Sequence, residues 1–281
     1  MPVNDPLRQA ANGVLPGQLI EHAIRAGYVE AGRFTMSAEN IQPASLDLRL
    51  GEKAARIRCS FLPGSDTVGH KLKEYALAEL DLRGDGAMLE VGHPYLVELK
   101  ERLRLPGGLF GRANPKSSTG RVDVFTRVIT DRSHRFDEVA PGYEGALYLE
   151  VVPLSFPILV REDLTLNQLR LTMGRPWLDD EAIRRAHEAE PLLYRAGEPV
   201  PADELVLSDG LFLSLDLQGD QSGRVGYSAR SHAPLLDLRR SGELEPGPFW
   251  EPVFREDGDR VVLSPNKFYL LMSNEAVSVP P

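Results

Sequence analysis

The sequence predicts a mainly β fold in two domains, and three observations lead to this prediction. The chain has 281 residues, which is more than one domain of average size requires. From residue 41 onward, short apolar runs are separated by Gly and Pro, a texture typical of a β-barrel or sandwich rather than of alternating strands and helices. Several residue groups then recur in the same order later in the chain, which indicates a tandem repeat.

The first part of the chain contains one short predicted helix followed by six predicted strands. Leu19, Ile20, Ala23 and Ile24 recur at helical spacing, and Gly27 follows them as a stop signal. The predicted strands are residues 45–50, 88–99, 122–130, 146–152, 158–160 and 165–171.

A second helix is predicted from Asp179 to Leu193, ending near Pro191. Acidic residues open this run and good helix formers follow them. Gly and Pro then return at residues 197–201. We therefore expect a helical linker over residues 172–203, between a β domain of residues 1–171 and the start of a second domain at 204–281.

The repeat is carried by residues that match in order and at nearly constant spacing. Ser45-Leu46-Asp47-Leu48 returns as Ser214-Leu215-Asp216-Leu217, an offset of 214 − 45 = 169. Five further matches share an offset of 269 − 95 = 174: Gly84-Asp85 with Gly258-Asp259, Leu89 with Leu263, Tyr95 with Tyr269, Leu96 with Leu270, and Pro106 with Pro280. A loop insertion accounts for the drift in offset, and a tandem duplication accounts for the shared order.

The second copy stops at a position that corresponds to the middle of the first copy. Pro280 matches Pro106, which precedes several predicted strands of the first copy. A domain that ended there would leave apolar strand faces and sheet edges uncovered. We therefore expect the natural chain to continue for about 60–90 residues beyond this second, apparently truncated copy.

Composition excludes some classes of function. The formal net charge is −9, whereas binding to a nucleic-acid polymer depends mainly on Lys and Arg that neutralise phosphates. The apolar stretches are far shorter than the ~20 residues that span a bilayer, and the first residues lack the apolar core of a secretion signal. A small anionic ligand remains possible, because it needs only a local basic pocket.

Cys59 is the only cysteine, which excludes an intrachain disulfide and a multi-cysteine zinc site. We therefore expect a cytoplasmic protein. Zinc-dependent nucleobase deaminases need a His/Cys/Cys or three-Cys ligand set. His93, His187 and His232 do not form a pair with metal-ligand spacing, so we interpret them as surface or structural residues and predict no metal site.

Four segments in residues 15–171 carry a resemblance to dCTP deaminases of the dCTP deaminase and dUTPase superfamily. Residues 41–51, IQPASLDLRLG, resemble that family's opening strand. Residues 116–121, KSSTGR, are similar to its G-R-S-S-x-x-R motif, with Lys116 in place of the first Arg. Residues 142–150, GYEGALYLE, resemble the P-G-[aromatic]-x-G strand that ends in the catalytic glutamate, and residues 164–169 resemble the closing strand with its frequent Gln.

This resemblance implies a dUTPase-like distorted β-barrel, or β-clip, with short flanking helices, and it implies the deamination of dCTP to dUTP. By resemblance Glu150 is the general base and then the general acid, while Ser117 and Arg121 hold the water and the developing charge. The implied substrate-binding residues are Lys116, Ser118, Asp131, Arg132, Tyr143 and Gln168. Magnesium would accompany the triphosphate, zinc would be absent, and relatives suggest a homo-oligomer with sites between subunits.

The match is weakest between Thr130 and Pro141, where the deaminases show a shorter T-A-x-R-I-D before P-G. Asp131 can also be compared with the aspartate by which dUTPases activate water, so a dUTP diphosphatase, or a bifunctional enzyme, is an alternative. The absence of a Gly-rich terminal arm of the dUTPase kind argues mildly against it. A second alternative is a nucleotide-binding protein without catalysis.

Overall fold

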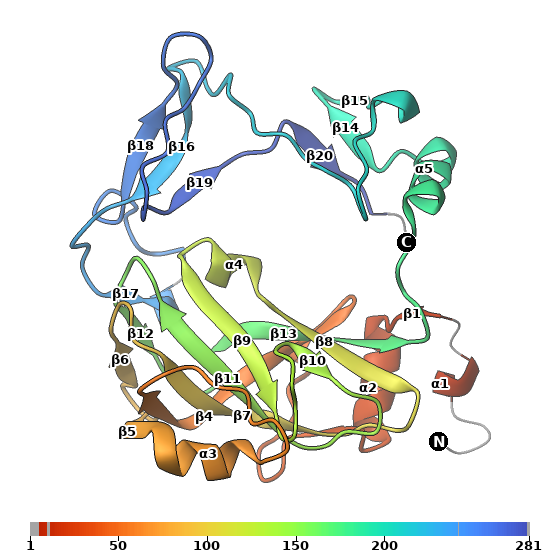
Figure 1. Ribbon diagram of the computed structural model, residues 1–281, viewed down its shortest axis with the longest axis vertical. Coiled ribbons are helices and arrows are strands. Elements are labelled where there is room, and N and C mark those ends of the chain that lie inside the picture. The colour runs from red at the N-terminus through yellow and green to blue at the C-terminus, as the bar shows by residue number, and fades with distance from the viewer. Residues whose placement is uncertain (1–5, 10–11, 241, 280–281) are drawn as a thin grey trace. The chain divides into compact units, whose positions relative to one another are not determined.

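The computed structural model describes residues 6–9, 12–240 and 242–279 (Figure 1). Contacts group the chain into two compact units, one of residues 1–176 with 231–245 and one of residues 177–230 with 246–281. Strands outnumber helices in both units, so the predicted mainly β fold is confirmed. Within the described residues, no helix is both long and apolar enough to cross a bilayer.

The first unit consists of many strands and a few short helices. In chain order its elements are α1 (Pro6–Gln9), β1 (Gly13–Val14), α2 (Gly17–Arg25), β2 (Val29–Glu30), η1 (Ala38–Asn40), β3 (Ile41–Gln42), β4 (Ser45–Ile57), α3 (Val68–Tyr75), β5 (Ala76–Asp81), β6 (Ala87–Leu89), β7 (Tyr95–Arg104), β8 (Leu109–Pro115), α4 (Ser117–Gly120), β9 (Val124–Thr130), β10 (Glu138–Val139), β11 (Glu144–Pro153), β12 (Ile158–Val160), β13 (Thr165–Met173), β17 (Leu236–Asp237) and η3 (Leu238–Arg240).

One large sheet forms the frame of this unit. Its main strand order is β10-β8-β13-β4-β7-β11-β9, and strands β8 and β10 contact β9, so the sheet curls into a nearly closed barrel-like form (Figure 1). Buried apolar side chains alternate along the strands, as Leu147, Leu149 and Val151 do on β11. The apolar faces of these strands therefore form the core of the unit.

Most predicted elements of this unit are confirmed, and the differences have local causes. Helix α2 covers the predicted helix, and Gly27 follows it with a φ of 75°. The strand expected over residues 88–99 is two strands, β6 and β7, because Gly92 adopts a φ of 75° and Pro94 lacks a backbone donor. Strand β8 and helix α3 were not predicted from the sequence.

The second unit contains smaller sheets. Its elements are α5 (Asp180–Ala189), β14 (Leu193–Arg195), β15 (Glu198–Pro199), η2 (Ala202–Glu204), β16 (Arg224–Ala229), β18 (Trp250–Phe254), β19 (Tyr269–Leu271) and β20 (Glu275–Val277). Helix α5 lies within the expected linker, yet it packs as part of this unit. Its buried His187 accepts a hydrogen bond from the backbone N–H of Leu192 (3.1 Å) and contacts the carbonyl of Val200 (2.6 Å). The second compact unit thus includes residues 177–203.

Each unit contains the same kind of internal hydrogen bond at matching positions of the repeat. The hydroxyl of Tyr95 accepts a hydrogen bond from the backbone N–H of Glu90 (3.1 Å), and that of Tyr269 accepts one from Ser264 (2.9 Å). The second Ser-Leu-Asp-Leu segment differs, since it forms only an isolated bridge at Leu215 where the first lies in β4. Pro280, the last repeat match, lies outside the described residues.

Candidate functional site

The KSSTGR segment forms the connection between strands β8 and β9. Lys116 leaves β8 with its backbone N–H bonded to the carbonyl of Leu166 (3.0 Å), and Ser117 begins the single turn of α4. Ser117, Ser118 and Arg121 are exposed. The guanidinium of Arg121 donates a hydrogen bond to the carbonyl of Ser117 (3.3 Å). The segment therefore presents two hydroxyls and one arginine to solvent.

A pocket adjoins this segment on the outer face of strands β4 and β13. Its volume is about 350 Å³, and its lining is Gln42, Pro43, Ala44, Ser45, Asp47, Lys116, Ser117, Ser118, Gln168 and Arg170. The structure thus brings together four residues that the sequence assigned to the site: Lys116, Ser117, Ser118 and Gln168. Gln168 is fixed there because its side-chain oxygen accepts a hydrogen bond from the hydroxyl of Ser45 (2.8 Å).

Of the two basic side chains that line the pocket, one forms an ion pair within the described residues and the other does not. The ammonium of Lys116 donates hydrogen bonds to the carboxylate of Asp47 and to the hydroxyl of Thr165 (2.8 Å). Asp47 is 4% exposed and therefore neutralises Lys116 at close range. Arg170 makes no ion pair within the described residues and bonds to the side-chain oxygen of Asn114 (2.8 Å). Hydroxyls beside an uncompensated guanidinium suit a phosphate.

Glu150 lies in the middle of β11, hydrogen-bonded between strands β7 and β9. Its cross-strand neighbours are Leu96 on β7 and Arg127 on β9. The residue is only 2% exposed, and a buried carboxylate requires partners. Arg127 supplies two of them, with Nε at 3.1 Å from one carboxylate oxygen and Nη2 at 3.3 Å from the other. The hydroxyl of Ser60 donates a third hydrogen bond (2.7 Å).

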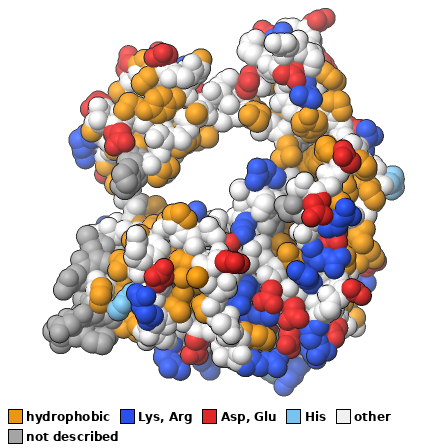
Figure 2. Space-filling view, turned by 180° about the vertical axis from the view of Figure 1, so that it is seen from behind, with side chains coloured by type: hydrophobic (Ala, Val, Ile, Leu, Met, Phe, Trp, Pro, Cys, Tyr) orange, Lys and Arg blue, Asp and Glu red, His pale blue; other side chains and the backbone are white. Residues whose placement is uncertain are grey.

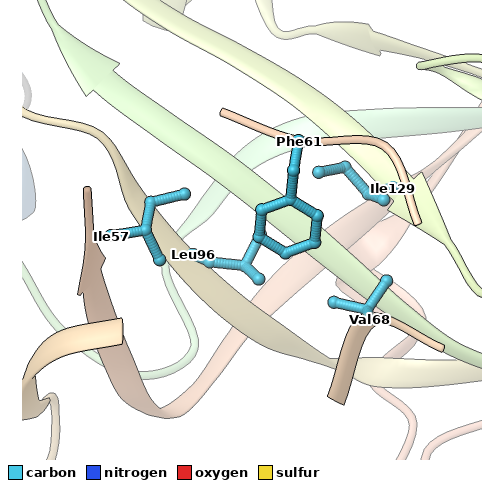
Figure 3. Packing of buried hydrophobic residues seen from close by; sticks show 5 residues of the cluster. All are labelled: Ile57, Phe61, Val68, Leu96 and Ile129. Atoms are coloured by element: carbon cyan, nitrogen blue, oxygen red, sulfur yellow. The ribbon is translucent and has the colours of Figure 1, made fainter. Parts of the chain in front are cut away.

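Ser60 reaches Glu150 because its neighbour is anchored in the core. Phe61 packs among Ile57, Leu96, Val68 and Ile129, and Figure 3 shows its ring between these four side chains. The ring of Tyr75 also stacks on Phe61, with a centroid distance of 5.2 Å. A buried aromatic ring restricts the backbone that carries it. The loop after β4 is thereby fixed with the hydroxyl of Ser60 beside the carboxylate.

Asp131, Arg132 and Tyr143 lie outside the pocket lining. The carboxylate of Asp131 accepts a hydrogen bond from the backbone N–H of Val68 (2.7 Å) at the start of α3. The hydroxyl of Tyr143 donates to the carbonyl of Ala146 (2.5 Å) and accepts from the N–H of Asp131 (3.3 Å). Burial raises the pKa of Tyr143 to about 12, so its hydroxyl stays protonated at neutral pH. Arg132 is exposed and has a φ of 54°.

Three residues of these clusters were missed by sequence reasoning. Arg127 and Ser60 contact Glu150 from another strand and from a loop, and Arg170 joins the pocket from β13. Arg170 had a signal in the sequence, since it follows Gln168 by two residues and so shares its strand face. Arg127 and Ser60 had none, because their contacts depend on strand register and loop packing.

Charges of both signs are mixed over much of the surface. On the face shown in Figure 2, Lys and Arg side chains lie among Asp and Glu side chains instead of forming one continuous basic area. Many of the described surface charges are paired, as Arg83 is with Asp81 (2.6 Å). This distribution agrees with the negative net charge and with a ligand that binds in a local site.

Comparison with known proteins gives the family. The model of the 2'-deoxycytidine 5'-triphosphate deaminase N-terminal domain matches residues 11–175, and that of the C-terminal domain matches residues 179–281. The solved structure of 2'-deoxycytidine 5'-triphosphate deaminase from Agrobacterium tumefaciens is 39% identical, with a TM-score of 0.89 over 97% of this chain and 77% of that one.

Curated relatives resemble the chain more distantly. The dCTP deaminase of Halorubrum lacusprofundi is 29% identical over 48% of this chain and 64% of its own length, so the chain covers less than two thirds of that relative. The dCTP deaminase, dUMP-forming, of Halobacterium salinarum is 26% identical over 55% of this chain and 80% of its own length. Both domain models together with the solved structure cover most of the sequence. The chain therefore belongs to the 2'-deoxycytidine 5'-triphosphate deaminase family.

Proposed function

We propose that this protein converts dCTP and water into dUTP and ammonia, with Glu150 as the group that moves protons. The observation that carries the proposal is the placement of Glu150, a 2% exposed carboxylate held by Arg127 and Ser60 on the strand that matches the family's catalytic strand. A carboxylate fixed in this way keeps its geometry for proton transfer.

The proposed reaction proceeds through a tetrahedral centre at C4 of the cytosine. Glu150 removes a proton from water as the water oxygen bonds to C4, and it passes that proton to N3 of the ring. The same carboxylate then takes the proton of the new C4 hydroxyl and delivers it to the amino group, the C4–N4 bond breaks, and ammonia leaves while C4 becomes a carbonyl carbon. Ser117 orients the water and Arg121 stabilises the developing charge. Chemistry of this kind assigns no task to a zinc ion, and we propose none.

The pocket beside the KSSTGR segment is the proposed triphosphate site. The hydroxyls of Ser117 and Ser118 and the charges of Lys116 and Arg170 line it, and Gln168 lies at its wall. Phosphate oxygens accept hydrogen bonds from such groups. Magnesium would enter only with the triphosphate of the substrate. Turnover should therefore depend on magnesium to the extent that free and metal-bound dCTP differ in affinity.

We infer that the working form is an oligomer. Among the described residues, the pocket lining contains Ser117 and Ser118 but not Glu150. A second copy of the chain can bring its carboxylate to the pocket of the first, as in a homo-oligomer with shared sites. Mixing the inactive variants Glu150→Gln and Ser117→Ala tests this arrangement. Recovered turnover on mixing supports shared sites, whereas no recovery in a stable mixed oligomer contradicts them.

The second candidate function is hydrolysis of dUTP to dUMP, alone or after deamination. The name of the Halobacterium salinarum relative includes dUMP formation, which gives this candidate its support. In this chain one oxygen of the Asp131 carboxylate accepts a hydrogen bond from the N–H of Val68 (2.7 Å), which ties it to the start of helix α3. A nucleotide-binding protein without catalysis is the third candidate.

One set of assays separates the three functions. Purified protein with magnesium is incubated with dCTP and with dUTP, and ammonia and pyrophosphate are measured, while calorimetry measures nucleotide binding. Ammonia from dCTP supports deamination, and pyrophosphate from dUTP supports the diphosphatase. Binding without either product would leave only the third candidate.

A further inference from the structure

The segment of residues 131–140, where the resemblance to the deaminase motif is weakest, contacts Arg127, the ionic partner of Glu150. Phe136 lies in this segment, and its ring covers the guanidinium of Arg127 at 3.6 Å from ring centroid to guanidinium carbon. Phe125 lies farther from the same guanidinium, at 5.2 Å. A cation at the shorter distance over an aromatic face is attracted to it. The segment thus supplies the nearer of the two aromatic contacts to Arg127.

Phe136 is itself held in place by the core. It packs against the cluster of Ile57, Phe61, Val68, Leu96 and Ile129, which also anchors the loop that carries Ser60. The cluster therefore fixes two groups around Arg127, the ring on its face and the hydroxyl at its edge.

Two further contacts hold the segment against strand β9. The carboxylate of Asp137 accepts a hydrogen bond from the backbone N–H of Val128 (2.8 Å), next to Arg127. Glu138 and Val139 form β10, which pairs with Arg112 and Gly111 of β8. The segment is thus secured to β9 and β8 on either side of the arginine, and Phe136 has little freedom to leave the guanidinium.

Arg127 in turn holds the carboxylate of Glu150 in one orientation. Nε and Nη2 of Arg127 contact different oxygens of the carboxylate, at 3.1 and 3.3 Å, and Nη2 also donates to the hydroxyl of Ser60. A paired fork of this kind sets the plane of a carboxylate as well as its charge. Rotation of the Glu150 side chain would break both of its contacts with Arg127 together.

We propose that residues 131–140 and Arg127 form a positioning device for Glu150, in which Phe136 clamps the guanidinium and Arg127 orients the carboxylate. Arg127 is a positioning residue because it acts through Glu150. The proposal rests on the proposed deaminase function. In this proposal the segment positions the group that transfers protons, which is a different role from contact with the base or sugar.

The test compares Arg127→Ala, Arg127→Lys and Phe136→Leu with Phe125→Leu, the matched change at the more distant ring. Ammonia release from dCTP gives kcat and KM, and thermal melting confirms that each variant is folded at the assay temperature. For Arg127→Ala, kcat should fall by about 10²-fold with KM within about 3-fold, since a small misplacement affects the chemical step more than binding. Phe136→Leu should lower kcat by about 3–10-fold, whereas Phe125→Leu should change it less than 2-fold.

A second readout separates positioning from a merely structural role. Guanidinium chloride at about 10–50 mM should raise the kcat of Arg127→Ala at least 10-fold. Sodium chloride at equal ionic strength should not raise it. Arg127→Lys, which keeps one donor and the charge, should lie between the parent and Arg127→Ala. Parent-like kcat in Arg127→Ala, or a loss that appears in KM and resists guanidinium, overturns the positioning role. If the unmodified protein releases no ammonia, the proposed function fails and this inference fails with it.

Discussion

The ammonium of Lys116 is hydrogen-bonded to the carboxylate of Asp47, a residue that is 4% exposed. Lys116→Met should therefore have two effects. The carboxylate of Asp47, left without its partner, should lower the free energy of unfolding by about 1–3 kcal/mol. This loss is smaller than for a fully buried ion pair because the pocket is open to water. Loss of the cation should also raise the KM for dCTP. The double variant Lys116→Met with Asp47→Asn should regain stability but keep the raised KM, and recovery of both would contradict a phosphate contact at Lys116.

Glu150→Gln keeps the size of the side chain and removes the base. We expect kcat to fall by roughly 10²–10⁴-fold, with dCTP affinity within a few-fold of the parent by calorimetry. Glu144→Gln is the control, because Glu144 lies on the same strand with a 69% exposed side chain. Near-normal ammonia release by Glu150→Gln would end its catalytic assignment.

Ser117 and Arg121 should affect the transition state more than binding. Arg121→Ala should cost about 2–4 kcal/mol of transition-state stabilisation, measured from kcat/KM, because a positive charge leaves the site. Ser117→Ala should lower kcat with a smaller change in KM. Arg161→Ala, at another exposed arginine, serves as the control. Parent-like kinetics in both site variants would mean that the KSSTGR segment is only a turn.

Asp137 should make stability depend on pH in a predictable direction. Burial raises the pKa of this carboxyl above its ordinary value of 3.8, although Arg127 and Arg112 oppose the shift. The native state then binds more protons than the unfolded chain, so Asp137 lowers stability as pH rises above 3.8. Asp137→Asn removes this contribution. The free energy of unfolding of Asp137→Asn relative to the parent should rise with pH above 3.8, and a difference that is independent of pH would contradict the prediction.

The purified protein should carry no stoichiometric zinc. One cysteine cannot supply the ligand set of the zinc-dependent nucleobase deaminases. Elemental analysis should find zinc well below one ion per chain, and zinc chelators should leave the ammonia release unchanged when magnesium is supplied. Tightly bound zinc together with zinc-dependent turnover would oppose the expectation.

The sequence predicts the strands of the first unit better than the contacts between its polar side chains. Alternation places Leu147, Leu149 and Val151 on one face of a strand and Glu150 on the other, and β11 has this pattern. Contacts place helix α5 in the second unit. Helix α5 looks like a linker when its periodicity is considered alone, but His187 ties it to the residues that follow.

Side-chain partners were the least predictable part of the site. Lys116 and Asp47 lie 69 residues apart, and Ser60 and Glu150 lie 90 apart, so only the folded sheet brings them together. Arg127 faces Glu150 because of the register of β9 with β11, which short motifs do not encode. The hydrogen bond between Asp131 and the start of α3 is a further contact that the motif alone does not reveal.

Ser60, which donates its hydroxyl hydrogen bond to Glu150, directly follows the chain's single thiol. Cys59 is exposed and unpaired, so a thiol-reactive fluorophore would attach at one position without any engineered cysteine. A dye there would sit one residue from a group that touches the buried carboxylate. Its emission would report whether the surroundings of that loop change when a nucleotide binds, in the unmutated protein.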